Sequence, residues 1–155
     1  MNNTNIIDLA TEKDNLGSDV AVKKALTLGT TPIVPIFMRE FANLIDQGFT
    51  TNNIVATNKS KVIYVEINNA IAGFIVYDIQ HDDVSKTCWI LFGTVLEPFR
   101  RRGLYKIMHS HLEIAAREQG SKQIFSLVHV NNTAMLELNK KLDKNPVFHR
   151  MEKYL

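Results

Sequence analysis

Residues 95–105 read VLEPFRRRGLY, and they join an apolar strand pattern to an amphipathic helix pattern. The first N–H groups of a helix have no partner within the helix, and the helix dipole makes that end positive. Such an end binds phosphate. Gly103 allows the backbone to approach a ligand closely, and the arginines at 100–102 carry forked donors that suit phosphate oxygens. The stretch therefore predicts a polyphosphate site between a strand and a helix.

A plainer interpretation of the same residues stays open at this point. The run at 100–102 could be a solvated stretch of charge, and Gly103 could be an ordinary turn residue. The position of the run between a strand pattern and a helix pattern favours the phosphate site over this alternative.

Strand and helix patterns alternate on both sides of this stretch. After it, the sequence predicts a helix over 104–120, a strand over 123–130, a helix over 133–141 and a closing strand over 146–155. Before it, the sequence predicts a weak strand over 53–57 and strands over 62–67, 70–79 and 87–96. Nearer the N-terminus, it predicts a first strand that includes 6–9, a helix from 18 or 19 to 28, and a helix that starts at 31–32 and stops at 48. This order predicts an α/β fold, in which a mixed sheet carries helices on its faces.

Length and composition limit the possible functions. A chain of 155 residues predicts one domain that spans residues 1–155. Cys88 is the only cysteine, which rules out a disulfide framework and a cysteine-based zinc site, and no metal is expected. The formal net charge of +2 is too small to imply a nucleic-acid partner, and no apolar stretch is long enough to span a bilayer. The N-terminus is unlike a secretory signal, so a cytoplasmic location is expected, without a membrane partner.

Residues 95–105 resemble the acetyl-coenzyme A motif of the GNAT acetyltransferases. That motif begins with a strand Val and runs Gln/Arg-x-x-Gly-x-Gly/Ala into a helix. Arg100 matches the first position and Gly103 the fourth, whereas Tyr105 stands where the family usually has Gly or Ala. The match implies that acetyl-coenzyme A binds here as a co-substrate.

A second part of the resemblance lies downstream. Val128 and Asn132 keep the family's spacing between a strand Val and an Asn, and the next helix resembles the family's Leu-Tyr-x-Lys-Leu-Gly-Phe. Asn139 takes the place of the Tyr, and Asp143-Lys144 replaces Gly-Phe. The resemblance covers roughly residues 60–155. It implies a GNAT-like fold, with a mixed and mostly antiparallel sheet flanked by helices, and N-acetyltransferase activity toward a primary amine.

The resemblance also implies a set of cofactor-binding residues on the strand end, the loop and the elements that follow. These are Thr94, Val95, Leu96, Arg100, Arg101, Arg102, Gly103, Leu104, Tyr105, Asn132 and Asn139. In this family the amine usually attacks the thioester directly, so the protein has to deliver a neutral amine. Neutralising a lysine-like amine at pH 7 adds about 4–5 kcal/mol to the barrier, and a base or an ordered water chain helps there.

The groups that would move protons are harder to identify. Family members often protonate the departing thiolate with the helix Tyr, and Asn139 cannot do so. His129 is the candidate base, because an imidazole has a suitable ordinary pKa and lies near the expected thioester; a structural hydrogen bond is its alternative role. His109 and His111 are expected to be surface or packing residues. Trp89 and the stripe from Phe37 to Phe41 are expected in the core rather than in a substrate cage.

Two other function classes compete with the N-acetyltransferase. The absent Tyr also fits a catalytically weak GNAT-like module that binds acyl-coenzyme A as a sensor or interaction domain. An RNA-binding domain fits poorly, because the arginine run has no interleaved aromatic residues and no broad basic face. The acceptor stays open among a polyamine, an aminoglycoside, an amino acid and a protein amine, and the sequence allows a homodimer.

Overall fold

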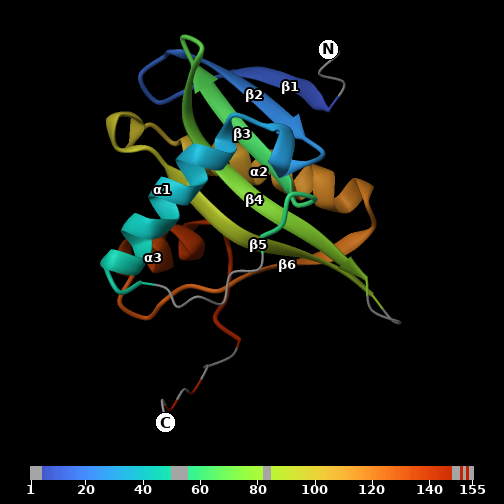
Figure 1. Cartoon of the computed structure of the whole chain (residues 1–155), viewed down its shortest axis with the longest axis vertical. Coiled ribbons are helices and arrows are strands. Elements are labelled where there is room, and N and C mark those ends of the chain that lie inside the picture. Colours follow the sequence, from blue (N-terminus) through green and yellow to red (C-terminus); the bar gives the residue numbers. More distant parts are fainter. Residues whose placement is uncertain (1–4, 50–55, 82–84, 148–150, 152, 154–155) are drawn as a thin grey trace.

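A computed structural model describes residues 5–49, 56–81, 85–147, 151 and 153 of the chain. Its elements run in the order β1 (Ile6–Lys13), β2 (Asp19–Ala25), η1 (Leu28–Thr30), α1 (Ile33–Asp46), β3 (Lys61–Ile67), β4 (Ala70–His81), β5 (Lys86–Val95), η2 (Glu97–Phe99), α2 (Leu104–Glu118), β6 (Ser121–Ser126) and α3 (Thr133–Lys141) (Figure 1). No helix in these ranges is long and apolar enough to cross a membrane.

The described strands form one six-stranded sheet in the order β1 to β6. Neighbouring strands from β1 to β5 are antiparallel, whereas β5 and β6 are parallel. A parallel pair needs a crossover connection, and α2 provides it. The sheet is therefore mixed and mostly antiparallel, and the α/β class predicted from the sequence is confirmed.

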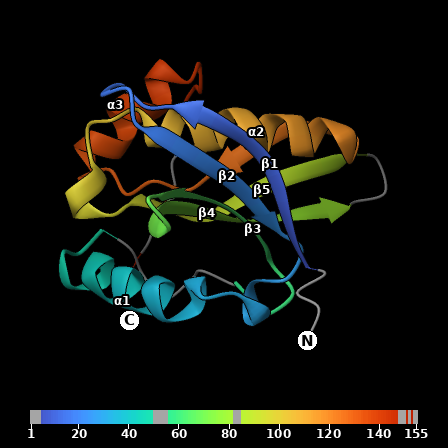
Figure 2. The ribbon, with the colours of Figure 1, turned by 90° about the horizontal axis from the view of Figure 1, so that it is seen from above.

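Helices cover both faces of this sheet. α1 lies on one face, and α2 and α3 lie on the other (Figure 2). The buried apolar cluster on the α2 face includes Ile75, Met108 and Leu112, and the cluster on the α1 face includes Phe37 and Phe74. The expected place of Phe37 in the core is confirmed. Each face of the sheet thus has its own hydrophobic core.

One predicted helix is wrong. Residues 19–25 form β2, and a short 3-10 turn follows at residues 28–30. Val20 and Val22 are fully buried, while Ala21 between them is only partly buried. This alternation with a period of two belongs to a strand with one buried face, and it outweighs the capping signal at residues 18–19.

The remaining predicted elements differ mainly at their ends. The strand predicted over 123–130 is β6, which begins at Ser121 and ends at Ser126. Residues 53–55 of the weak predicted strand lie outside the described residues, and residues 56–57 form no strand. Most of the closing strand predicted over 146–155 also lies outside them, and its described residues, 146, 147, 151 and 153, form no strand.

Candidate functional site

β5 pairs with the parallel strand β6 only along the first half of β5. Their pairing starts at Lys86 with Ser121 and ends at Ile90 with Ser126, although β5 continues to Val95. β5 also has an irregularity here, because Leu91 has no partner in the register with β4. A bulge of this kind bends a strand. Among the described residues, no strand pairs with the outer edge of residues 91–95, and the chains after β5 and β6 lead away from each other (Figure 1).

The open edge of β5 presents polar groups of the main chain. The N–H of Leu96 donates to the carbonyl of Ala72 on the inner side at 2.9 Å, and successive residues of a strand alternate in direction. Val95 therefore faces the outer side. Its carbonyl accepts a hydrogen bond from Nε of Arg100 there at 3.0 Å. Because the N–H and carbonyl of one strand residue point the same way, the N–H of Val95 lies on this edge too.

The loop after β5 leads directly into the N-terminus of α2. Arg101 has a φ of 64° and Gly103 a φ of 79°, so both residues adopt the left-handed backbone conformation. A Cβ at Gly103 would lie 3.1 Å from the side chain of Asn15, which leaves little room for any other residue. The hydrogen bond from the N–H of Ile107 to the carbonyl of Gly103 closes the first turn. The N–H groups of residues 104–106 precede it and are free to meet an anion.

The arginines of the loop take different directions. Arg101 is exposed and forms no hydrogen bond or ion pair within the described part of the chain. Arg100 reaches back to the open edge of β5. The guanidinium of Arg102 instead lies 3.4 Å from Asp14, whose side chain is fully buried, and it covers the ring of Phe99 at 5.7 Å. Charge is therefore available to a phosphate chain from Arg100 and Arg101, whereas Arg102 has a partner of its own.

Tyr105 places its backbone and its side chain in different surroundings. Its N–H belongs to the free helix N-terminus, but its ring is buried in the core on the α2 face. A Cβ at Gly93 on β5 would lie only 2.8 Å from the Tyr105 hydroxyl. The ring thus occupies the space that Gly93 leaves beneath β5. The large residue stands where the motif that residues 95–105 resemble usually has Gly or Ala, and the core accommodates it.

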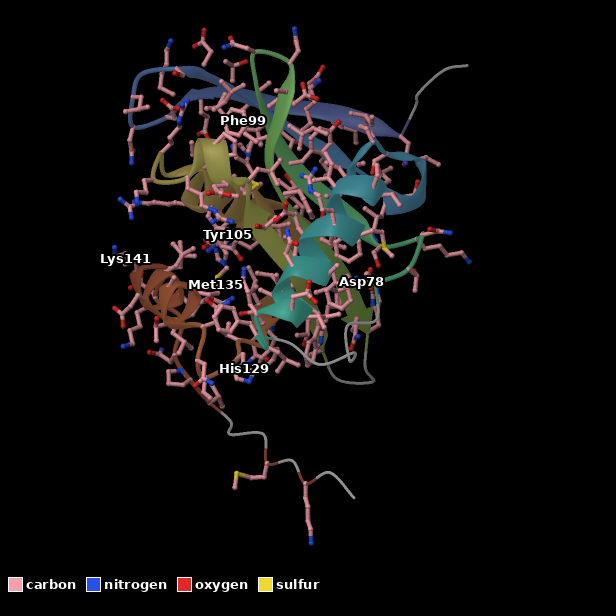
Figure 3. All side chains as sticks on the ribbon, turned by 60° about the vertical axis from the view of Figure 1, so that its left-hand side comes forward. Asp78, Phe99, Tyr105, His129, Met135 and Lys141 are labelled. Carbon is pink, nitrogen blue, oxygen red and sulfur yellow. The ribbon has the colours of Figure 1, made fainter. Side chains whose placement is uncertain are left out.

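The two asparagines predicted to bind the cofactor lie on α3 and at its start. Asn132 is the N-cap residue of α3, and its Oδ1 accepts a hydrogen bond from the N–H of Met135 at 3.3 Å. Nδ2 of Asn139 donates to the carbonyl of Met135 at 2.8 Å, and its Oδ1 accepts a hydrogen bond from Ser126 at 3.5 Å. Met135 lies on the side of α3 toward the rest of the molecule, and Lys141 lies on the outer side (Figure 3).

His129 lies beyond the end of β6 and not on the strand. Its Nδ1 accepts a hydrogen bond from the N–H of Asn131 at 3.1 Å, and its ring centroid lies 6.3 Å from that of Phe49 (Figure 3). In a neutral imidazole, this places the proton on Nε2. The lone pair that a base needs is therefore already engaged in a structural hydrogen bond.

The α1 face of the sheet holds polar and aromatic side chains that the sequence interpretation missed. Asp78 on β4 accepts a hydrogen bond from Ser60 at 3.1 Å, and burial raises the pKa of its carboxyl against the opposing effects of Ser60 and Lys61. Trp89, paired with Asp78 across β4 and β5, stacks on Phe125 at 5.3 Å and is only partly buried. The expectation that Trp89 belongs to the core is wrong. A single Asp within the apolar strand over 70–79 was the signal available in the sequence.

These features belong to one large open cleft. Of the residues predicted from the sequence, those that line it are Thr94, Val95, Arg100, Arg101, Gly103, Leu104, Tyr105, His129, Asn132 and Asn139. Leu96 and Arg102 do not line it. Asp78, Trp89, Phe125 and Glu40 line the same cleft. The cleft thus joins a helix N-terminus, an open strand edge and a carboxylate-bearing face.

Comparisons with solved structures identify the same fold in several acetyltransferases. An aminoglycoside acetyltransferase from an uncultured soil metagenomic sample, in complex with sisomicin, is 14% identical with a TM-score of 0.67, over 88% of this chain and 97% of that chain. The aminoglycoside N-acetyltransferase AAC(6')-Iy in complex with CoA is 17% identical with a TM-score of 0.57, over 88% and 97%. The ribosomal-protein-alanine N-acetyltransferase from Brucella melitensis biovar Abortus 2308 is 12% identical with a TM-score of 0.67, over 87% and 100%. At these identities the likeness concerns the fold.

The sequence comparison identifies the family. No curated protein matches the chain significantly. The model of the acetyltransferase (GNAT) family, however, matches residues 32–143, which include β5, the loop that joins β5 to α2, α2 itself, β6 and α3. The chain therefore belongs to the acetyltransferase (GNAT) family of acyltransferase enzymes.

Proposed function

We propose that this protein transfers the acetyl group of acetyl-coenzyme A to a primary amine. The observation that carries the proposal is the continuity between the free N-terminus of α2 and the open edge of β5. The N-terminus suits the phosphates of coenzyme A, together with Arg100 and Arg101. The open edge over residues 91–95 suits the amide-containing arm, because unpaired main-chain groups can bond to amides.

This arrangement gives the chain's own residues defined tasks in the reaction. The phosphate loop and the strand edge hold and orient acetyl-coenzyme A. An outward N–H near the Leu91 end of the open edge can donate to the carbonyl oxygen as negative charge develops on it. The acceptor amine has to approach as the neutral form, so a group in the cleft has to accept its proton.

The α1 face is the proposed approach for the acceptor. Asp78 and Glu40 provide carboxylates there, and Trp89 and Phe125 provide an aromatic wall, which together favour a cationic amine. Solved structures of the same fold include complexes with sisomicin and with the bisubstrate analogue CoA-S-monomethyl-acetylneamine. We propose a small cationic amine as the acceptor, and a protein amine is the alternative, as in the ribosomal-protein-alanine enzyme.

The site of cofactor binding can be tested with one charged substitution. Gly103→Asp puts a negative charge and a side chain where the phosphates would lie, and we expect it to raise the dissociation constant of coenzyme A by roughly 100-fold or more. Gly120→Asp is the matched control, because Gly120 also has a positive φ, of 81°, but lies after the other end of α2. Calorimetry that finds the same affinity for Gly103→Asp and wild type would place the phosphate site elsewhere.

The absence of the helix Tyr supports a second candidate function, a catalytically weak module that binds acyl-coenzyme A. Neither amide atom of Asn139 can protonate a thiolate. Release of coenzyme A should therefore be measured with a polyamine, an aminoglycoside, an amino acid and a peptide with a free N-terminus. Binding of acetyl-coenzyme A without acetylation of any amine would favour the module over the enzyme.

Three wider expectations remain proposals. They are that residues 1–155 form a single domain, that the protein acts in the cytoplasm, and that it forms a homodimer. Cys88 is a buried free thiol, which is compatible with a reducing compartment. Size-exclusion chromatography with light scattering would decide the oligomeric state.

A further inference from the structure

Lys144 follows α3 at a position where the related motif has an apolar residue. Asp143 takes a left-handed conformation with a φ of 57°, and the N–H of Lys144 donates back to the carbonyl of Asn139 at 3.0 Å. This turn directs the side chain of Lys144 inward. Its Nζ donates a hydrogen bond to Oγ of Ser126 at 2.7 Å. The cationic side chain of Lys144 thus lies next to the end of β6.

Ser126 occupies the point at which β5 and β6 separate. It is the last residue of β6, and its partner Ile90 is the last residue of β5 in that pairing. The open edge then runs from Leu91 to Val95, about 13 Å along the strand. A ligand bound by its phosphates at the start of α2 and extended along this edge would bring its far end toward Ser126. In the proposed function, that far end is the thioester of acetyl-coenzyme A.

The surroundings of Lys144 leave its charge without an ion-pair partner among the described residues. The groups that face it are the thiol of Cys88 from β5, and His109 and Glu113 from α2. Glu113 is engaged with His109 at 3.1 Å and with Arg117 at 3.5 Å. Burial lowers the pKa of Lys144 to about 8, and the opposing effects of Cys88 and Glu113 do not restore it.

We propose that Lys144 is the proton source for the coenzyme A thiolate that leaves during acetyl transfer, and that it acts through the hydroxyl of Ser126. This proposal rests on the proposed acetyl transfer. Before transfer the Ser126 hydroxyl donates its single proton to Oδ1 of Asn139, so the hydroxyl has to rotate toward the sulfur when the thiolate forms; Asn139 holds the Ser126 oxygen in place without giving a proton. Lys144 and Ser126 together serve as the proton donor, the role that the helix Tyr has in the related motif.

When the carbon–sulfur bond of the tetrahedral intermediate breaks, its electron pair goes to sulfur. The sulfur takes the proton of the Ser126 hydroxyl, and the Ser126 oxygen takes a proton from the ammonium group of Lys144. Lys144 is left as a neutral amine and regains its proton from water. An amine with a pKa of about 8 is matched to this task, because an ordinary thiol has a pKa of about 8.5.

The first test measures the thiol of bound coenzyme A and needs no acceptor. A cation near a thiol lowers the thiol pKa, so the thiolate absorbance of bound coenzyme A should appear at lower pH in wild type than in Lys144→Met. We expect a difference of roughly one pH unit or more between the two. Lys141→Met, on the outer side of α3, is the control and should titrate as wild type does. Equal thiol pKa values in wild type and Lys144→Met would overturn the proposal.

The second test is the pH dependence of kcat at saturating acetyl-coenzyme A. The proton source is lost as pH rises through the pKa of Lys144, so kcat of wild type should fall above about pH 8. Lys144→Met, Lys144→Gln and Ser126→Ala should lower kcat roughly 10-fold or more and remove that limb, with little change in KM for acetyl-coenzyme A. If the role of Lys144 is purely structural, its substitution should change the melting temperature and leave the fall in kcat above about pH 8 in place. Failure of coenzyme A to bind would refute the proposed function itself, whereas binding with an unchanged limb refutes only the role of Lys144.

Discussion

Gly93 on β5 and Tyr105 on α2 occupy complementary volumes in the core. Tyr105 is large where the related motif has Gly or Ala, and Gly93 is small where a strand normally carries a side chain. The two residues thus form a matched pair across the β5–α2 contact. Two other contributions shape the loop between β5 and α2. They are the left-handed conformation of Gly103 and the ion pair of Arg102 with Asp14.

Substitution of Gly93 should reveal this pairing. Gly93→Ala places a Cβ 2.8 Å from the Tyr105 hydroxyl, so we expect a loss of about 1–3 kcal/mol in the free energy of unfolding. In the double variant with Tyr105→Ala, the added methyl group meets a cavity instead, and the total loss should be smaller than the sum of the two single losses. Urea denaturation measures all four proteins. Additive losses would show that the two sites are independent.

Asn132 links the element α3 to the cleft through its capping bond. Its side chain accepts the hydrogen bond of the Met135 N–H, and it also lines the cleft. Asn132→Ala should lose the cap and reduce the free energy of unfolding by about 1 kcal/mol. Asn132→Ser keeps a capping oxygen but loses the amide, so it separates the two roles.

If the amide of Asn132 contacts the arm of acetyl-coenzyme A, Asn132→Ser should raise KM for that substrate at an unchanged melting temperature. Steady-state kinetics and thermal denaturation of the two variants provide the measurement. A normal KM in Asn132→Ser, with instability confined to Asn132→Ala, would leave Asn132 as a cap only.

The sequence predicted the loop between β5 and α2 and most of the elements, because these depend on short-range periodicity and on Gly103. It did not predict β2, because an alternation of only two valines is a weak signal in the sequence, whereas in the structure the strand is stabilised by its pairing with β1 and β3. The contacts that separate Arg102 from the cleft and bring Lys144 to Ser126 depend on chain segments distant in sequence and on the left-handed turn at Asp143. Neither feature has a local signature, so both needed the three-dimensional structure.

At the scale of the whole molecule, the two faces of the sheet have separate proposed tasks. The start of α2 and the inner side of α3 bound the proposed cofactor site, and the α1 face carries Asp78 and Trp89 for the acceptor. The two faces meet at the opening where β5 and β6 stop pairing. Variants on one face should therefore affect one substrate and leave the other unchanged.

Asp78→Asn tests this division of the molecule. The variant removes a carboxylate from the acceptor face, so KM for a cationic amine should rise roughly 10-fold, while the affinity for coenzyme A stays as in wild type. Calorimetry and initial rates separate the two effects. Weaker binding of coenzyme A in Asp78→Asn would contradict the division into two faces.

The base that accepts the amine proton stays a prediction. His129→Gln should lower kcat/KM by roughly 100-fold if His129 fills this role, because the site then loses its general base. The hydrogen bond from Asn131 to its Nδ1 points to a structural role, in which case the rate and pH profile are retained. Asp78 is then the remaining candidate base on the acceptor face.

The unpaired edge of β5 has a consequence for the protein when no ligand is bound. Strand edges of this kind attract strands from other molecules and are common starting points of aggregation. Residues 91–95 should exchange their outward amide hydrogens rapidly in the free protein and slowly once coenzyme A covers them. Bound cofactor would then also reduce aggregation of the protein, and its supply during expression and storage would influence how much protein stays in solution.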